Sequence, residues 1–222
     1  GANRQGDVDA INLTISNPTN SSLTNSCNHQ VYGKVFGCAN AADYNRSVTT
    51  NILCGVGEIG ELYGGSNLAD IGREGSTNAN VTLNLYGGVH TQVFAGSKGD
   101  LASLPGTGHT DKASNIFGNV TLNLFGGVVT NAYGGSNYNG NIAGTITVNV
   151  LDIEDEDCTS EALDLTNVYG ASNLADYTPT AGSTTISPVV NVIHIAQASG
   201  IRGNVYGGGN QASVKASPQV NI

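Results

Sequence analysis

The same eight-residue pattern occurs twice, 39 residues apart, as VTLNLYGG at 81–88 and VTLNLFGG at 120–127. In both copies Val and Leu alternate with Thr and Asn, which is the period-2 pattern of a half-buried strand. Weaker copies begin at Ile11, Val48, Ile146 and Val189, and residues 220–222 start another. Repetition at this spacing restricts the chain to solenoids, propellers or helical arrays.

A second unit, an aromatic residue followed by a glycine-rich turn, lies between successive strand units. It reads LYGGSNLAD from Leu62, VYGASNLAD from Val168 and VYGGGNQAS from Val205. Its aromatic residues are separated by 27, 31, 39, 36 and 37 residues. They are Phe36, Tyr63, Phe94, Tyr133, Tyr169 and Tyr206. The alternation of the two units predicts six coils and the start of a seventh.

The two-unit repeat favours a parallel coil over the other repeat architectures. No segment shows a capped 3.6-residue period, and the 31 glycines disfavour long helices. Propeller blades need hairpin turns, and Asn139-Gly140 is the one dipeptide of that kind. We therefore predict an all-β fold over residues 1–222: a parallel β-solenoid, specifically a right-handed β-helix of about six irregular coils. Because the spacing varies, we expect loop insertions at 101–115 and 152–164.

The residues of the aromatic turn have structural and binding interpretations. The glycine pair is expected to form a corner with positive φ. An Asn follows in five of the six turns and is replaced by Lys98 in the third, and stacked Asn side chains can form an amide ladder. These residues are Asn40, Asn67, Asn137, Asn173 and Asn210. We favour the ladder over a sugar or ion site. The aromatic residues are interpreted as an inward stack or as a carbohydrate platform.

The outward strand positions also align between coils. One column holds Thr82, Thr121 and Thr147, and the next holds Asn84, Asn123, Asn149 and Asn191. Thr columns occur on the ice-binding faces of some β-solenoids, but a solvated polar face is the default interpretation.

Catalytic residues are hard to assign in this pattern. Glycoside hydrolysis needs paired carboxylates, whereas the aligned outward positions hold Thr and Asn. Arg202 and Lys215 suit an eliminative lyase by residue type alone, and the four His residues match no metal motif. We expect no enzyme, and we keep a polysaccharide lyase or hydrolase and a non-catalytic glycan-binding module as alternatives.

Cofactor candidates are equally few. An acidic run can hold calcium, although it lacks an ordered ligand loop and such runs are usually solvated. It contains Asp152, Glu154, Asp155, Glu156 and Asp157. The four Cys residues match no zinc motif, and a disulfide in an exported protein is possible, for example between Cys27 and Cys54. No cofactor is expected, with calcium as the alternative.

Charge limits the partners. The net charge is −9, with 8 Lys plus Arg against 17 Asp plus Glu. A duplex nucleic-acid binder needs a basic footprint, and anionic membrane surfaces repel an acidic chain. No apolar run reaches the length of a membrane span. We expect neither nucleic acid nor membrane insertion.

Three phrases resemble a known group of proteins: GNVYGGGNQASV at 203–214, YGGSNLADIG at 63–72 and VTLNLYGGVHTQVFAGSKGD at 81–100. They are similar to the repeats of very long, adhesin-like surface proteins of anaerobic gut and oral bacteria, which alternate a TVTIxGGxV strand with a GNVYGGGNxADV turn. The resemblance runs from about Val31 onward. It implies an exported, extracellular or cell-surface β-helix with an adhesive or scaffold function, a host or bacterial surface glycan or protein as partner, and no catalytic residues to carry over. The coil length, the acidic insert and the Cys residues depart from that pattern.

The chain begins and ends within the coil pattern. Uncapped coils expose strand edges, which pair readily with other strands. We therefore expect the solenoid to continue at both ends, either as further polypeptide or as head-to-tail copies that form a filament.

Overall fold

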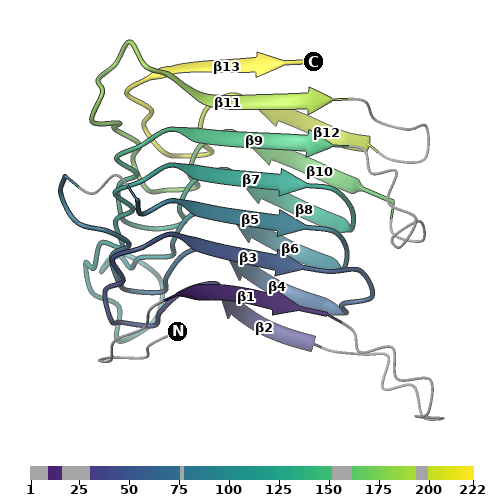
Figure 1. Cartoon of the computed structure of the whole chain (residues 1–222), viewed down its shortest axis with the longest axis horizontal. Helices are drawn as coiled ribbons and strands as arrows, with labels where there is room; N and C mark the ends of the chain where they lie inside the picture. The colour runs from purple at the N-terminus through teal and green to yellow at the C-terminus, as the bar shows by residue number, and fades with distance from the viewer. Residues whose placement is uncertain (1–9, 17–30, 76–77, 152–161, 194–199) are drawn as a thin grey trace.

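The computed structural model describes residues 10–16, 31–75, 78–151, 162–193 and 200–222, and these form two parallel β-sheets (Figure 1). The odd-numbered sheet contains β1 (Ile11–Ile15), β3 (Val48–Ile52), β5 (Val81–Leu85), β7 (Val120–Leu124), β9 (Ile146–Leu151), β11 (Ile186–Ile193) and β13 (Ser217–Asn221). The even-numbered sheet contains β2 (Val31–Phe36), β4 (Glu58–Tyr63), β6 (Val89–Phe94), β8 (Val128–Tyr133), β10 (Asp164–Tyr169) and β12 (Gly200–Tyr206). The all-β parallel β-solenoid is thus confirmed.

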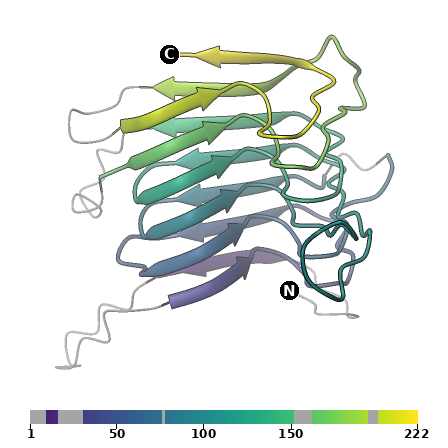
Figure 2. The same ribbon diagram turned by 180° about the vertical axis from the view of Figure 1, so that it is seen from behind.

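Each of the first six coils contributes one strand to each sheet, and β13 begins a seventh coil. The chain runs along the front sheet of Figure 1, returns along the rear sheet seen in Figure 2, and rises by one strand before the next coil. Seen from the C-terminal end, the chain turns counterclockwise as the coils rise toward the observer, which makes the solenoid right-handed (Figures 1 and 2). Matching positions of the repeats lie side by side: Val81 pairs with Val120 in the odd-numbered sheet, and Tyr63 pairs with Phe94 in the even-numbered sheet.

An irregular third side joins the end of each even-numbered strand to the next odd-numbered strand. It contains isolated parallel bridges rather than a sheet, and these link Tyr44 to Ile71, Ile71 to Ile116 and Ile116 to Ile142. Its backbone is satisfied between coils, since the N–H of Ile71 donates to Asn115 O at 2.8 Å and that of Ile116 donates to Asn141 O at 2.9 Å. The third side therefore holds the turns in register without continuous strands.

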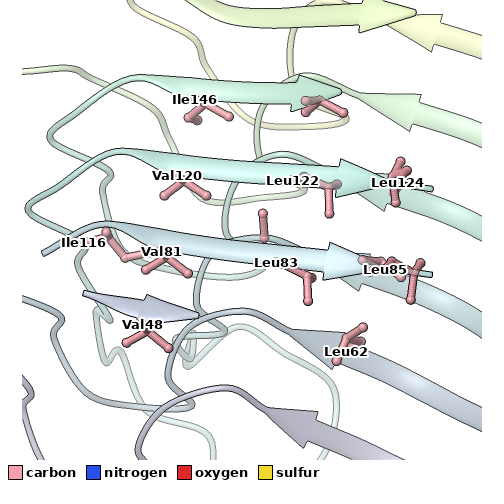
Figure 3. Close-up of a cluster of buried hydrophobic side chains, with 14 of the residues drawn as sticks. Val48, Leu62, Val81, Leu83, Leu85, Ile116, Val120, Leu122, Leu124 and Ile146 are labelled. Atoms are coloured by element: carbon pink, nitrogen blue, oxygen red, sulfur yellow. The ribbon is translucent and has the colours of Figure 1, made fainter. Parts of the chain in front are cut away.

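The core fills the space between the sheets with layers of identical or similar side chains. Leu83 stacks on Leu122, and Leu85 stacks on Leu124, all with no exposed surface (Figure 3). Apolar residues at alternate strand positions reach this core because successive side chains of a strand point to opposite faces. At about 25 cal/mol per Å² of buried apolar surface, this continuous column is the main source of stability.

The glycine pair of the aromatic turn does not adopt the expected conformation. Gly64, Gly65, Gly134 and Gly135 have no positive φ, so that prediction is wrong. The glycine pair that does include a positive φ is the one that follows the odd-numbered strands, at Gly88 (90°) and Gly127 (94°). The aromatic turns need glycine because the neighbouring coil lies too close for a Cβ: on Gly135 it would collide with Ser172 Oγ.

The segment 101–115 leaves the third side of the third coil as a closed loop. Asp100 and Lys112 form an antiparallel bridge at its base, with N···O distances of 2.8 and 3.0 Å. The chain then rejoins the coil at Asn115, whose N–H donates to Asp70 Oδ1 at 2.7 Å. Of the other expected insertion, residues 152–161 lie outside the described residues.

Candidate functional site

The six aromatic residues form one continuous stack across all six coils. Neighbouring ring centroids lie 4.7 to 4.9 Å apart, with interplanar angles of 8° to 11°. The parallel register brings the rings together, because each ends its even-numbered strand at the same position. Tyr63, Phe94 and Tyr133 in the middle are buried, whereas Tyr206 at the end is 43% exposed.

This stack lies apart from the main core. Leu62 belongs to the main core cluster, and the next side chain, Tyr63, points to the opposite face of the strand and joins a separate aromatic cluster. The stack therefore lies on the outer side of the even-numbered sheet, under the glycine-rich turns. Because the interior rings cover one another's faces, their faces are closed to a sugar ring.

The turn Asn residues form two hydrogen-bonded runs. Asn67 Nδ2 donates to Asn40 Oδ1 at 2.7 Å, Asn173 to Asn137 at 2.9 Å, and Asn210 to Asn173 at 2.9 Å. The runs are separated by Lys98, which occupies the corresponding position of the third coil. The same coil carries the 101–115 loop, so two departures from the repeat coincide there.

Around Lys98 the hydrogen bonds of the repeat are rearranged. An ammonium group offers donors and no acceptor, and Asn137 Nδ2 donates instead to the Tyr63 hydroxyl at 2.7 Å. That hydroxyl donates to Glu61 Oε2 at 2.6 Å, and Glu61 Oε1 pairs with Lys34 Nζ at 2.8 Å. We call these five residues, Lys34, Glu61, Tyr63, Lys98 and Asn137, the Lys98 node.

Electrostatics at the node reflect burial. Desolvation by burial, followed by the contact with Glu61, raises the pKa of Tyr63 far above its ordinary value, so its hydroxyl stays protonated as a donor. Burial lowers the pKa of Lys98, with Asp100 acting in the opposite direction. Lys98 Nζ lies 5.4 Å from the centroid of the Tyr138 ring and 3.3 Å from Gly99 O. Within the described part of the chain, Asn67 Oδ1 is buried without a hydrogen-bond donor.

The 101–115 loop is anchored by a second polar contact beside the node. His109 Nδ1 lies 2.7 Å from Asp100 Oδ1, and Thr110 N–H donates to Asp100 Oδ2 at 3.0 Å. Desolvation by burial acts to raise the pKa of Asp100, but the Thr110 hydrogen bond and the His109 contact outweigh it, and the pKa is lowered. This pair positions the loop. The aligned repeats contain no equivalent of it, which is why the periodicity did not predict it.

A longer amide ladder lies on the outer face of the odd-numbered sheet. The row consists of Asn51, Asn84, Asn123, Asn149, Asn191 and Asn221, and from Asn84 onward each Nδ2 donates to the Oδ1 of the preceding coil at 2.7 to 2.9 Å. Sequence reasoning aligned part of this column but placed the ladder only at the turn. The recurrence of Asn at a fixed strand position was the signal that pointed to it.

A third row, formed by the serines of the aromatic turns, was missed from the sequence. The N–H of Ser66, Ser97 and Ser136 donates in each case to the hydroxyl of the next serine, at 3.0 to 3.2 Å. The row ends at Ser172, and all four serines are buried. Their regular place between the glycines and the Asn was a usable signal. These hydroxyls replace the strand hydrogen bonds that the turn cannot make.

A hollow of about 180 Å³ lies beside β1, with Ile11, Leu13, Phe36 and Cys38 in its lining. It is smaller than typical ligand pockets of about 300–1,000 Å³. Burial raises the pKa of the Cys38 thiol, which opposes formation of the reactive thiolate. The hollow therefore gives no support to a catalytic site.

Metal and disulfide predictions fall mostly outside the described residues. Asp152, Glu154, Asp155, Glu156 and Asp157 are among them, so calcium binding there stays a prediction. Among the described residues, no group of three or more His, Cys, Asp or Glu side chains is placed to hold a metal ion. Cys54 is disulfide-bonded. Cys27, its suggested partner, lies outside the described residues, so the pairing stays a prediction.

Comparisons with protein-family models, curated proteins and solved structures find no match for this chain. The described segments include no helix long and apolar enough to cross a membrane.

Proposed function

We propose that this chain is a non-enzymatic structural or adhesive segment of an exported bacterial surface protein or fibre. The observation that carries the proposal is the use of the repeated polar and aromatic positions. They join each coil to the next through the six-ring stack and the amide ladder from Asn51 to Asn221. Side chains committed to one another in this way favour a stiff shaft over a substrate cleft.

The disulfide supports the exported location. Disulfides persist in oxidising compartments and are rare in the cytosol of most organisms. Cys54 is disulfide-bonded, and it lies in the turn between β3 and β4. An extracellular or cell-surface location, as the repeat resemblance implies, fits this chemistry.

Assembly end to end is part of the proposal. All of β13 is exposed, and Tyr206 and Val220 are 43% and 38% exposed. Exposed strand edges accept a further parallel strand. A second copy of the chain would pair β1 of its first coil with β13, and such head-to-tail contacts generate a filament.

The proposal is tested on one purified sample of the chain by measuring its thermal unfolding, its attachment to cell surfaces and its cleavage of polysaccharides. We expect attachment to bacterial or host cell surfaces, a high unfolding temperature, and no unsaturated or reducing-end products from uronic-acid polymers. Product formation would show the lyase or hydrolase alternative instead. Absence of attachment to every surface tested would remove the adhesive part of the proposal.

A further inference from the structure

The outer face of the odd-numbered sheet is uncharged across its four central coils. Four rows of side chains cross β3, β5, β7 and β9. The first row is the residue just before each strand, the second and third are outward-facing strand positions, and the fourth is the residue that follows β3, β5 and β7 or ends β9. The row preceding the strands contains Ser47, Asn80, Asn119 and Thr145, and the next contains Thr49, Thr82, Thr121 and Thr147. At the chain's own charged fraction of 11%, sixteen positions would carry about two charges, and these carry none.

This face retains hydrogen-bonding capacity directed at solvent. An Asn amide has two N–H donors and two lone pairs on its oxygen. In the ladder, the side-chain amides of Asn84 and Asn123 each donate one hydrogen bond through Nδ2 and accept one at Oδ1. Within the described residues, the second N–H and the second lone pair of each have no protein partner, and the half-exposed hydroxyls of Thr82 and Thr121 have none either. The face therefore presents aligned donors and acceptors at every coil.

An apolar edge borders these polar rows. The fourth row consists of Leu53, Tyr86, Phe125 and Leu151, all half-buried, and the Tyr86 and Phe125 rings stack at 4.6 Å. Across the short turn, Val89 and Val128 are 50% and 44% exposed. Exposed apolar side chains gathered beside polar rows mark interaction surfaces.

The repeat of this surface indicates the kind of partner. Each row repeats once per coil, at the strand spacing of about 4.8 Å, along the front face in Figure 1. A partner that matches it repeats along the same direction, offers hydroxyl donors and acceptors, carries no charge and has apolar C–H faces. We propose that this face, formed by β3, β5, β7 and β9, binds a neutral polysaccharide lying along the solenoid. This inference rests on the proposed adhesive function and names its surface and partner class.

The test is depletion of the chain from solution by insoluble glycans. The probes are cellulose, chitin and β-1,3-glucan particles, with polygalacturonate gel as the anionic probe. The face variant is Thr82→Lys with Thr121→Lys, which places two cations on half-exposed positions without removing a protein hydrogen bond. The matched control is Thr91→Lys with Thr130→Lys, because those threonines are exposed on the even-numbered sheet.

We expect the wild-type chain and the control to bind at least one neutral probe, and the face variant to lose at least tenfold in affinity. Equal loss in both variants, or binding to polygalacturonate alone, would overturn the inference. So would arrest of ice growth by the wild-type chain without glycan binding, or a change of oligomeric state in the face variant. Cell attachment is measured in parallel. If cells still bind the face variant as well as the wild type, the adhesive function stands and this surface is wrong.

Discussion

Asn137 in the fourth coil donates a hydrogen bond of 2.7 Å to the hydroxyl of Tyr63 in the second coil. This contact passes the third coil because Lys98 stands where the repeat has Asn. Elsewhere the turn amides bond to the adjacent coil, as Asn173 does to Asn137. One substitution in the repeat thus leaves Asn67 Oδ1 buried without a donor and redirects the next amide to an aromatic hydroxyl.

Replacing Lys98 by Asn is expected to stabilise the solenoid by about 1 kcal/mol, since a new Nδ2 donor reaches Asn67 Oδ1 and a buried acceptor is satisfied. The midpoint of urea unfolding measures this change. Lys112→Asn, in the 101–115 loop outside the row, serves as the control and should leave the midpoint unchanged. A lower midpoint for Lys98→Asn would mean that the contact with Tyr138 outweighs the amide ladder.

Asn123→Ala is expected to lower the free energy of unfolding by about 1–2 kcal/mol, because it removes two ladder hydrogen bonds, to Asn84 and from Asn149. Thr121→Ala, two residues earlier on the same face, removes a hydroxyl with no hydrogen bond among the described residues and should change it by less than about 0.5 kcal/mol. Equal effects in chemical denaturation would show that the ladder contributes nothing beyond an ordinary polar surface.

Two glycines test the distinction between close approach and positive φ. Gly135→Ala places a Cβ against Ser172 Oγ and is expected to cost about 3 kcal/mol, because two coils must separate. Gly75→Ala has open space around the Cβ but a φ of +79°, and should cost about 1 kcal/mol. Thermal unfolding followed by circular dichroism ranks the two. A larger loss of stability for Gly75→Ala than for Gly135→Ala would mean that close approach of the next coil is not what requires glycine in the aromatic turn.

The sequence predicted the solenoid because the repeat itself encodes the register: Val81 and Val120 occupy equivalent positions and become neighbours. It could not distinguish two reasons for a glycine, since Gly88 and Gly135 look alike in sequence, and only Gly88 has a positive φ in the structure. The Lys98 node was equally hidden. Its partners come from the first, second and fourth coils, and their meeting depends on how far each side chain reaches across the stack.

The aromatic stack makes stability depend on pH on the alkaline side. Burial, followed by the influence of Tyr169, raises the pKa of Tyr133 to about 12, against about 10 in an unfolded chain. Because the folded-state pKa is the higher one, this group's contribution to stability is complete below about pH 10 and is lost as the pH rises to about 12. We expect the free energy of unfolding to fall across that window, and Tyr133→Phe to flatten the fall.

Tyr86→Phe is the control, since it alters the separate ring pair with Phe125. Urea unfolding between pH 9 and about 12, with tyrosinate absorbance followed in parallel, measures both variants. An unchanged slope in Tyr133→Phe would show that Tyr133 ionises without opposing the fold.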